Sequence, residues 1–390
     1  MKIKIYIFFL FFFSSKVVQA QQASLVIAYN MMQKGDLDNA LKVVESAVQN
    51  PETANSAKAW YYKGWILKEQ FKKKGGIDPD FSLRRNAVAA FHKSIGFDTK
   101  AEFKKDCTKL IHFVCTSLYN EGTDAFNEKK YKSAIVMFEE YVADLSILSP
   151  DSVDHSSYFF LGYSCHHEKQ EAKAKKYLEK CLALKYEDAI VYDFLAHIYE
   201  KEGKDAEAIK TIETGAVKFP NDKAIAISYV NMLMKRQKNK EAIPRIEKAI
   251  KLDPKSIDLY LVMGTACERM SVADPVKKAD YLDKAKEAYT KVLSLDSNVF
   301  MANYNLGIIL YNGAVEKIND QSYDIDILAL DDVLNQTTVL FKKALPYLER
   351  SLRLKPASKN TLIALEGIYV HVNAEEKLAQ VREKLAKQQQ

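Results

Sequence analysis

The hydrophobic positions of this chain follow a helical period over most of its length. Between residues 155 and 256, apolar residues recur three and four positions apart, with charged residues between them. This spacing is typical of helices that bury one face and expose the other. The chain of 390 residues contains 13 Gly and 9 Pro, which leaves little material for the many turns of a β-fold. The pattern therefore predicts an all-α protein.

The helical pattern repeats along the chain. Ala174, Ala208 and Ala242 are 34 residues apart, and larger apolar residues follow each of them at the same distance. Pro220 and Pro254 close two of the three units. Each unit is thus predicted to be two amphipathic helices with a tight turn between them and a stop after the second.

Small residues recur on both helices of each unit. We expect the small residues of the first helix, such as Gly162 and Ala196, to face the alanines of the second helix so that the two helices approach closely. One unit cannot bury its apolar faces alone, so successive units must stack on one another.

This arrangement resembles the tetratricopeptide repeat, in which a large residue, Leu-Gly, Tyr, Ala and Pro recur in a fixed order. The segments NYNLGIILY at 303–311 and EAIPRIEKAIKLDP at 241–254 carry the resemblance most clearly. The resemblance implies a right-handed α-solenoid of helix-turn-helix repeats.

The same register extends over most of the chain. It predicts eight repeats, followed by capping helices and a polar tail at 359–390. The repeats span 21–54, 57–100, 115–148, 155–188, 189–222, 223–256, 257–297 and 300–357. Four stretches lengthen the regular spacing, namely 70–84, 145–154, 269–282 and 312–338. The last is expected to be a helix extension with a loop folded back on the solenoid, or alternatively a segment that docks a partner.

The first twenty residues differ from the rest. Lys2 and Lys4 precede an apolar run at 5–13, and Val18-Gln19-Ala20 supplies small residues two positions apart. These are the parts of a secretory signal peptide at 1–20, and the apolar run is short for a membrane anchor. The sequence predicts an exported protein that is periplasmic, envelope-associated or secreted.

The charge and the cysteine content argue against some classes of function. The formal net charge is +6, or about +3 without the lysines of the first twenty residues, and it is not clustered. Nucleic acid is therefore not an expected partner. The five cysteines have no metal-type spacing, and we interpret them as small packing residues.

The sequence contains no phosphate-binding loop, zinc-protease motif or nucleophile elbow, so no catalytic residue, metal or cofactor is predicted. One cluster suggests an alternative. His166 and His197, with Asp193, are residue types that bind metals, which would make the protein a metal-dependent or enzyme-accessory module.

The leading prediction places function in a groove. The resemblance implies that fixed positions of the first helices line a concave surface, and aromatic residues there supply large contact area at small entropic cost. The groove positions are Lys58, Tyr61, Trp65, Lys68, Tyr119, Phe126, Phe159, Tyr163, His166 and His197. The sequence thus predicts a non-enzymatic scaffold or adaptor of the bacterial envelope, whose partners are other proteins, including secretion or assembly machinery.

Overall fold

The structure is a computed structural model that describes residues 23–76, 78–148, 153–321 and 327–388. These ranges contain α-helices, a short 3-10 helix and connecting turns, and no strand. The all-α prediction is confirmed. The expected signal peptide at 1–20 lies outside the described residues.

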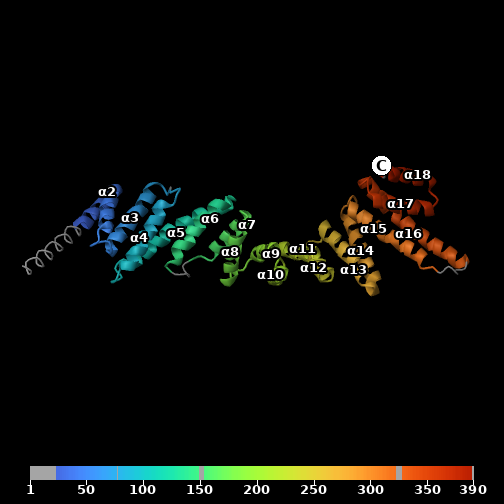
Figure 1. Cartoon of the computed structure of the whole chain (residues 1–390), viewed down its shortest axis with the longest axis horizontal. Coiled ribbons are helices and arrows are strands. Elements are labelled where there is room, and N and C mark those ends of the chain that lie inside the picture. The colour runs from blue at the N-terminus through green and yellow to red at the C-terminus, as the bar shows by residue number, and fades with distance from the viewer. Residues whose placement is uncertain (1–22, 77, 149–152, 322–326, 389–390) are drawn as a thin grey trace, which may run out of the picture. The chain divides into compact units, whose positions relative to one another are not determined.

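Contacts between residues divide the chain into two compact units, Met1–Ile198 and Tyr199–Gln390 (Figure 1). The first unit holds a helical segment at 23–33, then α2 (Leu37–Gln49), α3 (Ala57–Lys73), α4 (Ser82–Phe97), α5 (Lys104–Asn127), α6 (Tyr131–Ser146), α7 (Ser156–His167) and α8 (Glu171–Ala183). Helix α9 (Ala189–Lys201) carries the boundary between the units. The second unit holds α10 (Asp205–Lys218), α11 (Lys223–Lys235), α12 (Asn239–Leu252), α13 (Ile257–Ala273), η2 (Pro275–Lys277), α14 (Lys278–Leu295), α15 (Phe300–Asn319), α16 (Ile327–Leu354), α17 (Lys359–His371) and α18 (Glu375–Lys387).

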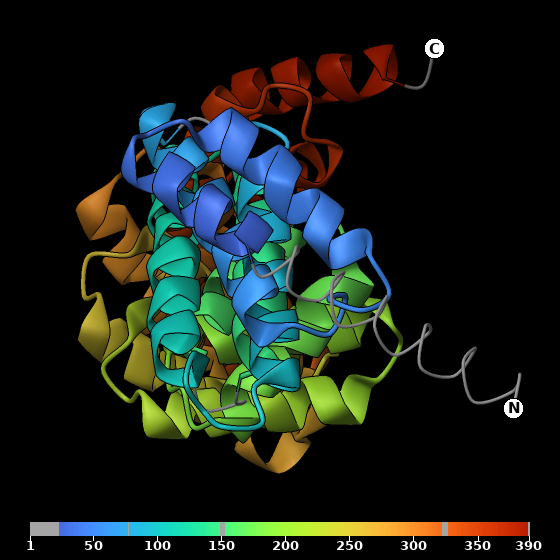
Figure 2. The same cartoon turned by 90° about the vertical axis from the view of Figure 1, so that its left-hand side faces the viewer.

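Most helices that follow one another in the chain pack side by side. Figure 2 shows this for the blue to green helices of the first unit, which lie nearest the viewer. Each predicted repeat range contains one helix pair. The third pair differs from its predicted range, because α5 begins at Lys104 and not near residue 115.

The turn inside each repeat has a recurring backbone conformation. Lys169, Gly203 and Gln237 stand at equivalent positions, and each has a positive φ, of 59°, 73° and 56° respectively. The next residue donates its N–H back across the helix end, as Gln170 does to the carbonyl of Cys165 at 2.8 Å. This is a common way to end a helix, and here only one of the three positions is a glycine.

The close approach of the paired helices has a second basis besides the one expected. A Cβ placed on Gly162 would lie 2.6 Å from the side chain of Leu178, which stands four residues after Ala174. Gly264 similarly faces Tyr289, at 2.4 Å. The glycine of the first helix therefore accommodates a large side chain of the second helix as well as lying near the alanine, as where the Ala87 carbonyl is 3.0 Å from the Cβ position of Gly64. The reason is that this large residue lies one helical turn beyond the alanine, on the same face.

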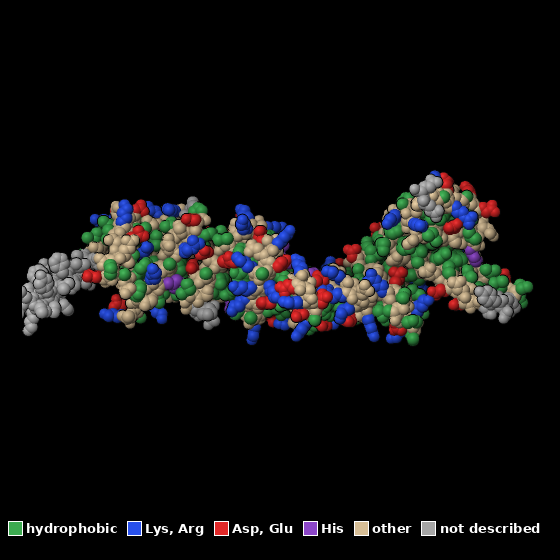
Figure 3. All heavy atoms as spheres, viewed as in Figure 1, with side chains coloured by type: hydrophobic (Ala, Val, Ile, Leu, Met, Phe, Trp, Pro, Cys, Tyr) green, Lys and Arg blue, Asp and Glu red, His purple; other side chains and the backbone are tan. Residues whose placement is uncertain are grey.

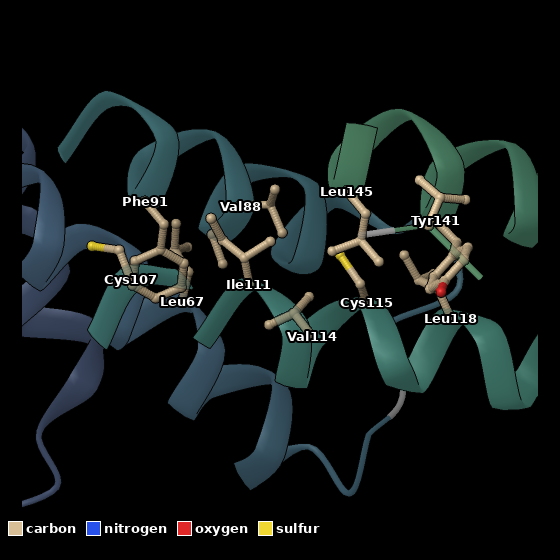
Figure 4. Packing of buried hydrophobic residues seen from close by; sticks show 12 residues of the cluster. Leu67, Val88, Phe91, Cys107, Ile111, Val114, Cys115, Leu118, Tyr141 and Leu145 are labelled. Carbon is tan, nitrogen blue, oxygen red and sulfur yellow. The ribbon is translucent and has the colours of Figure 1, made fainter. Parts of the chain in front are cut away.

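The core consists of such residues stacked along each unit. Figure 4 shows one stretch, in which Phe91 and Val88 of α4 lie against Ile111 and Cys107 of α5. All five cysteines are buried and unbridged, in agreement with a packing role. Burial raises the pKa of the Cys165 thiol to about 11, which keeps it protonated at neutral pH.

The first of the lengthened stretches has specific contacts around one buried arginine. In the stretch 70–84, the Arg84 side chain is 1% exposed and lies between the rings of Phe71 and Phe81. Its guanidinium contacts the Glu121 carboxylate at 2.6 Å and the Asp78 carboxylate at 3.4 Å. A buried cation needs such partners, so this ion cluster fixes the path of the longer connection.

The largest lengthened stretch, 312–338, extends both helices of a pair. Helix α15 continues to Asn319 and α16 begins at Ile327, while residues 322–326 lie outside the described part. The expected helix extension is thus present, and residues 327 to 338 are helical where a loop folded back on the solenoid was expected.

Candidate functional site

Four of the aromatic residues expected in the groove come together between α5 and α7. Tyr119 and Phe126 lie on α5, and Phe159 and Tyr163 lie on α7. The ring centre of Tyr163 is 5.1 Å from that of Phe126 and 5.9 Å from that of Phe159. The Tyr119 hydroxyl hydrogen-bonds the Ser156 hydroxyl at 2.7 Å. All four side chains are half-buried, so each keeps part of its ring at the surface.

Three aromatic residues that the groove positions did not include complete this cluster. The ring of Phe160 lies 4.8 Å from Phe126, that of Tyr131 lies 5.9 Å from Phe126, and that of Phe194 lies 5.3 Å from Tyr163. We call the whole set the aromatic network. It consists of Tyr119, Phe126, Tyr131, Phe159, Phe160, Tyr163 and Phe194.

The rings of the aromatic network hold one another in place. Several meet edge to face, as Phe126 does with Phe160 at an interplanar angle of 62° and with Tyr163 at 66°. This is the favourable geometry for aromatic pairs and fixes the rings before any partner arrives. Burial raises the pKa of the Tyr163 phenol, which therefore stays neutral. The network is a rigid, uncharged surface with a few hydroxyl groups.

The two aromatic groove positions on α3 belong to a different set of contacts. The ring of Tyr61 lies 5.1 Å from Phe103 and 6.4 Å from Phe91. Trp65 packs against the hydrophobic clusters on both sides of α3. Among the described residues, no ring contact joins Tyr61 or Trp65 to the aromatic network. Of the six aromatic residues expected on one surface, four belong to the aromatic network, while Tyr61 and Trp65 are related to it through the buried cluster against which Tyr119 also packs.

The two lysines of the expected groove also differ from each other. Lys58 is exposed, and its ammonium lies 5.6 Å from the ring centre of Tyr62. Lys68 is only 7% exposed, and its ammonium lies between the rings of Trp65 and Phe113 beside the Glu69 carboxylate. Lys68 therefore contributes to the packing of α3 and offers little charge to a partner, in contrast to the expectation.

The histidines of the alternative hypothesis make separate contacts. His166 Nδ1 lies 3.3 Å from the Glu171 carboxylate, and its ring stacks on Phe194 at 4.2 Å. His197 Nε2 lies 3.5 Å from the carboxylate of Asp193 on the same helix. In the part of the chain that the structure describes, no three His, Cys, Asp or Glu side chains are grouped so as to hold a metal ion.

The charged surface is mixed. On the face shown in Figure 3, Lys and Arg side chains alternate with Asp and Glu side chains along the chain. A search of the described helices for one both long and apolar enough to cross a bilayer finds none.

Comparisons with known proteins give the following likenesses. Family models of the tetratricopeptide repeat match residues 155–188, which contain the pair α7–α8, and residues 191–224, which contain α10 and all but the first two residues of α9. No curated protein matches the chain. A solved structure of the protein MamA is similar at 17% identity, with a TM-score of 0.38, over 52% of this chain and 92% of that one. A structure of YrrB, described as a TPR protein with an unusual peptide-binding site, is similar at 16% identity, with a TM-score of 0.39, over 56% of this chain and 97% of that one.

Proposed function

Since the chain is a tetratricopeptide-repeat protein, we propose that it is a non-enzymatic adaptor that holds other proteins in the bacterial cell envelope. Solenoids of stacked helix pairs present extended surfaces suited to binding other proteins. The aromatic network is the observation that supports the proposal most strongly. It gathers half-buried aromatic residues from α5, α6, α7 and α9 on the first unit.

The network has the properties of a protein-binding surface. Aromatic rings provide large contact area, and rings already fixed by their neighbours lose little side-chain entropy on binding. Exposed apolar patches on folded proteins commonly mark interaction sites. The partner that fits this surface is a segment with apolar side chains that pack on the outer parts of the contacting rings of Phe126, Phe159 and Tyr163.

Export is the second part of the proposal. It is supported by the basic start, the short apolar run and the small residues at the end of the segment 1–20. An exported adaptor would meet envelope proteins, which include components of secretion and assembly machinery.

The test is capture of partners from an envelope extract by the purified protein, with identification by mass spectrometry. We expect the variants Tyr163→Ala and Phe159→Ala to weaken capture of the same partners by about 1–2 kcal/mol, or roughly 5- to 30-fold in affinity. Trp65→Ala is a poorer test, because Trp65 also packs against two hydrophobic clusters.

Val136→Ala is the matched control, since Val136 is exposed on α6 and is not part of the network. Circular dichroism melts of all three variants report whether the fold is retained. Folded Tyr163 and Phe159 variants that capture the same proteins as strongly as the Val136 variant would show that the network is not the binding surface.

A further inference from the structure

A pocket in the second unit lies where two of the lengthened stretches meet. It has a volume of about 430 Å³, is open to solvent, and is lined by the last turns of α13, by η2 and α14, and by the second half of α15. Its walls are largely aliphatic and include Val272, Leu282 and Ile308. At its rim, the Lys278 ammonium pairs with the Glu316 carboxylate at 2.8 Å.

Two carboxylates line this pocket, and Glu268 is the one that is not paired with Lys278. Glu268 accepts a hydrogen bond of 2.5 Å from the hydroxyl of Tyr289, which is fully buried. The Tyr289 oxygen in turn accepts a 2.9 Å hydrogen bond from the side-chain amide of Asn305. This chain of hydrogen bonds fixes the orientation of the Glu268 carboxylate.

The negative charge of Glu268 has no counterpart nearby. Within the described ranges of the chain, no Lys, Arg or His forms an ion pair with this carboxylate. Lys278, which also lines the pocket, is paired with Glu316. Burial raises the pKa of Glu268 above its ordinary value, which shows that its surroundings disfavour the uncompensated charge. A cation entering the pocket would relieve this cost.

We propose that this pocket binds a lysine or arginine side chain of a partner protein, with the cationic group at Glu268. The aliphatic stem of such a side chain matches walls formed by Val272, Leu282 and Ile308. Its head group supplies the charge that the carboxylate lacks, and hydrogen bonds between ionised groups are the stronger kind. The site lies in the second unit and does not depend on the aromatic network of the first.

The proposal is tested with three short peptides, acetyl-Gly-X-Gly-amide, in which X is lysine, arginine or norleucine. Norleucine has the aliphatic stem of lysine without its charge. Each peptide is titrated into the purified, isotope-labelled protein, and the backbone amide signals of α13 and α15 are followed by NMR. We expect saturable shifts with the lysine or the arginine peptide, and binding of the norleucine peptide at least about 5-fold weaker.

Two variants test separately how much the Glu268 charge and the aliphatic wall contribute to binding. Glu268→Gln keeps the shape of the side chain and removes its charge, and we expect about 10-fold weaker binding of the cationic peptides. Val272→Ser changes a wall residue that is 82% exposed, so the fold should be unaffected, and we expect about 2- to 5-fold weaker binding. Glu287→Gln, an exposed carboxylate on α14, is the matched control and should bind as the unchanged protein does.

Several results would overturn the proposal. They are the absence of saturable shifts with either cationic peptide, equal binding of the norleucine peptide, or undiminished binding by both the Glu268 and the Val272 variants. None of these results bears on capture through Tyr163 and Phe159, so the two proposals fail separately.

Discussion

At the scale of single residues, Asp144 shows how the fold changes the chemistry of a side chain. It lies on α6, and its Oδ2 atom is buried without a hydrogen-bond partner in the described structure. Burial and the nearby charge of Glu140 raise the pKa of Asp144 to about 7, while Arg85 acts in the opposite direction. The carboxyl group is therefore held in surroundings that favour its protonated form.

This predicts a pH-dependent effect of the substitution Asp144→Asn. The folded-state pKa lies above the ordinary value of 3.8, so the folded protein holds the proton more tightly than the unfolded chain does. The stability of the unchanged protein should then fall as pH rises from about 4 to about 7, and the variant should escape this loss. We expect the variant to be about 1–3 kcal/mol more stable at pH 8 and to gain much less at pH 4.

Urea unfolding at both pH values measures this difference. Asp106→Asn, which changes an exposed carboxylate on α5, is the matched control and should show no comparable change with pH. A gain in stability for the Asp144 variant that is equal at pH 4 and pH 8 would contradict the argument.

At the scale of helices, the repeat depends on one pairing rule. The large residue that fills the space over a first-helix glycine stands four positions after the buried alanine in every such pair. The pairs are Gly64 with Phe91, Gly122 with Phe138, Gly162 with Leu178, Gly264 with Tyr289 and Gly307 with Leu348. The alanine lies one turn earlier on the same face, where the helix backbones come close, as at the Ala87 carbonyl 3.0 Å from the Cβ position of Gly64.

The rule predicts the cost of enlarging the alanine. Ala208 of α10 is 0% exposed, and Ile212 follows it at the position of the large residue. The variant Ala208→Leu should push the helices apart and lower the free energy of unfolding by about 1–3 kcal/mol. Chemical denaturation checks this value.

Ala206→Leu is the control on the same helix. Ala206 is exposed, and leucine has a high helix propensity. If both variants unfold at the same denaturant concentration as the unchanged protein, the assignment of Ala208 to the helix interface is wrong.

At the scale of the whole molecule, the two units carry different candidate surfaces. The first has the neutral aromatic network, and the second has a pocket with aliphatic walls in which the Glu268 carboxylate has no ion-pair partner among the described residues. An adaptor that presents two surfaces of different chemistry can select two kinds of partner segment. The proposed export from the cytoplasm would decide which proteins the adaptor can meet as partners.

Export makes a direct prediction about the chain itself. The mature protein should begin at Gln21 and be recovered from the envelope or the medium, because the segment 1–20 has the features of a cleaved signal peptide. N-terminal sequencing or intact-mass measurement of the native protein in cell fractions checks this. An intact Met1 on protein from the cytoplasm would rule out the location and weaken the envelope role.

The sequence by itself determined the class of the fold and the order of the helix pairs. Both depend on local information, since the period of apolar residues, the recurrence of Ala174, Ala208 and Ala242 and the closing prolines lie within single repeats. The positions of Tyr119, Phe126, Phe159 and Tyr163 on the first helices of their pairs followed from the same register.

The tertiary structure decided which of these side chains meet. Phe160 and Phe194 join the aromatic network although they stand beside the groove positions, because contact depends on the angle at which successive helices pack. Lys68 becomes buried and Glu268 lines a pocket for the same reason. Helix formation is specified by near neighbours in the sequence. The contacts and charge environment of a side chain, in contrast, are set by residues of other helices. The spacing of residues within one helix does not show how close those residues lie.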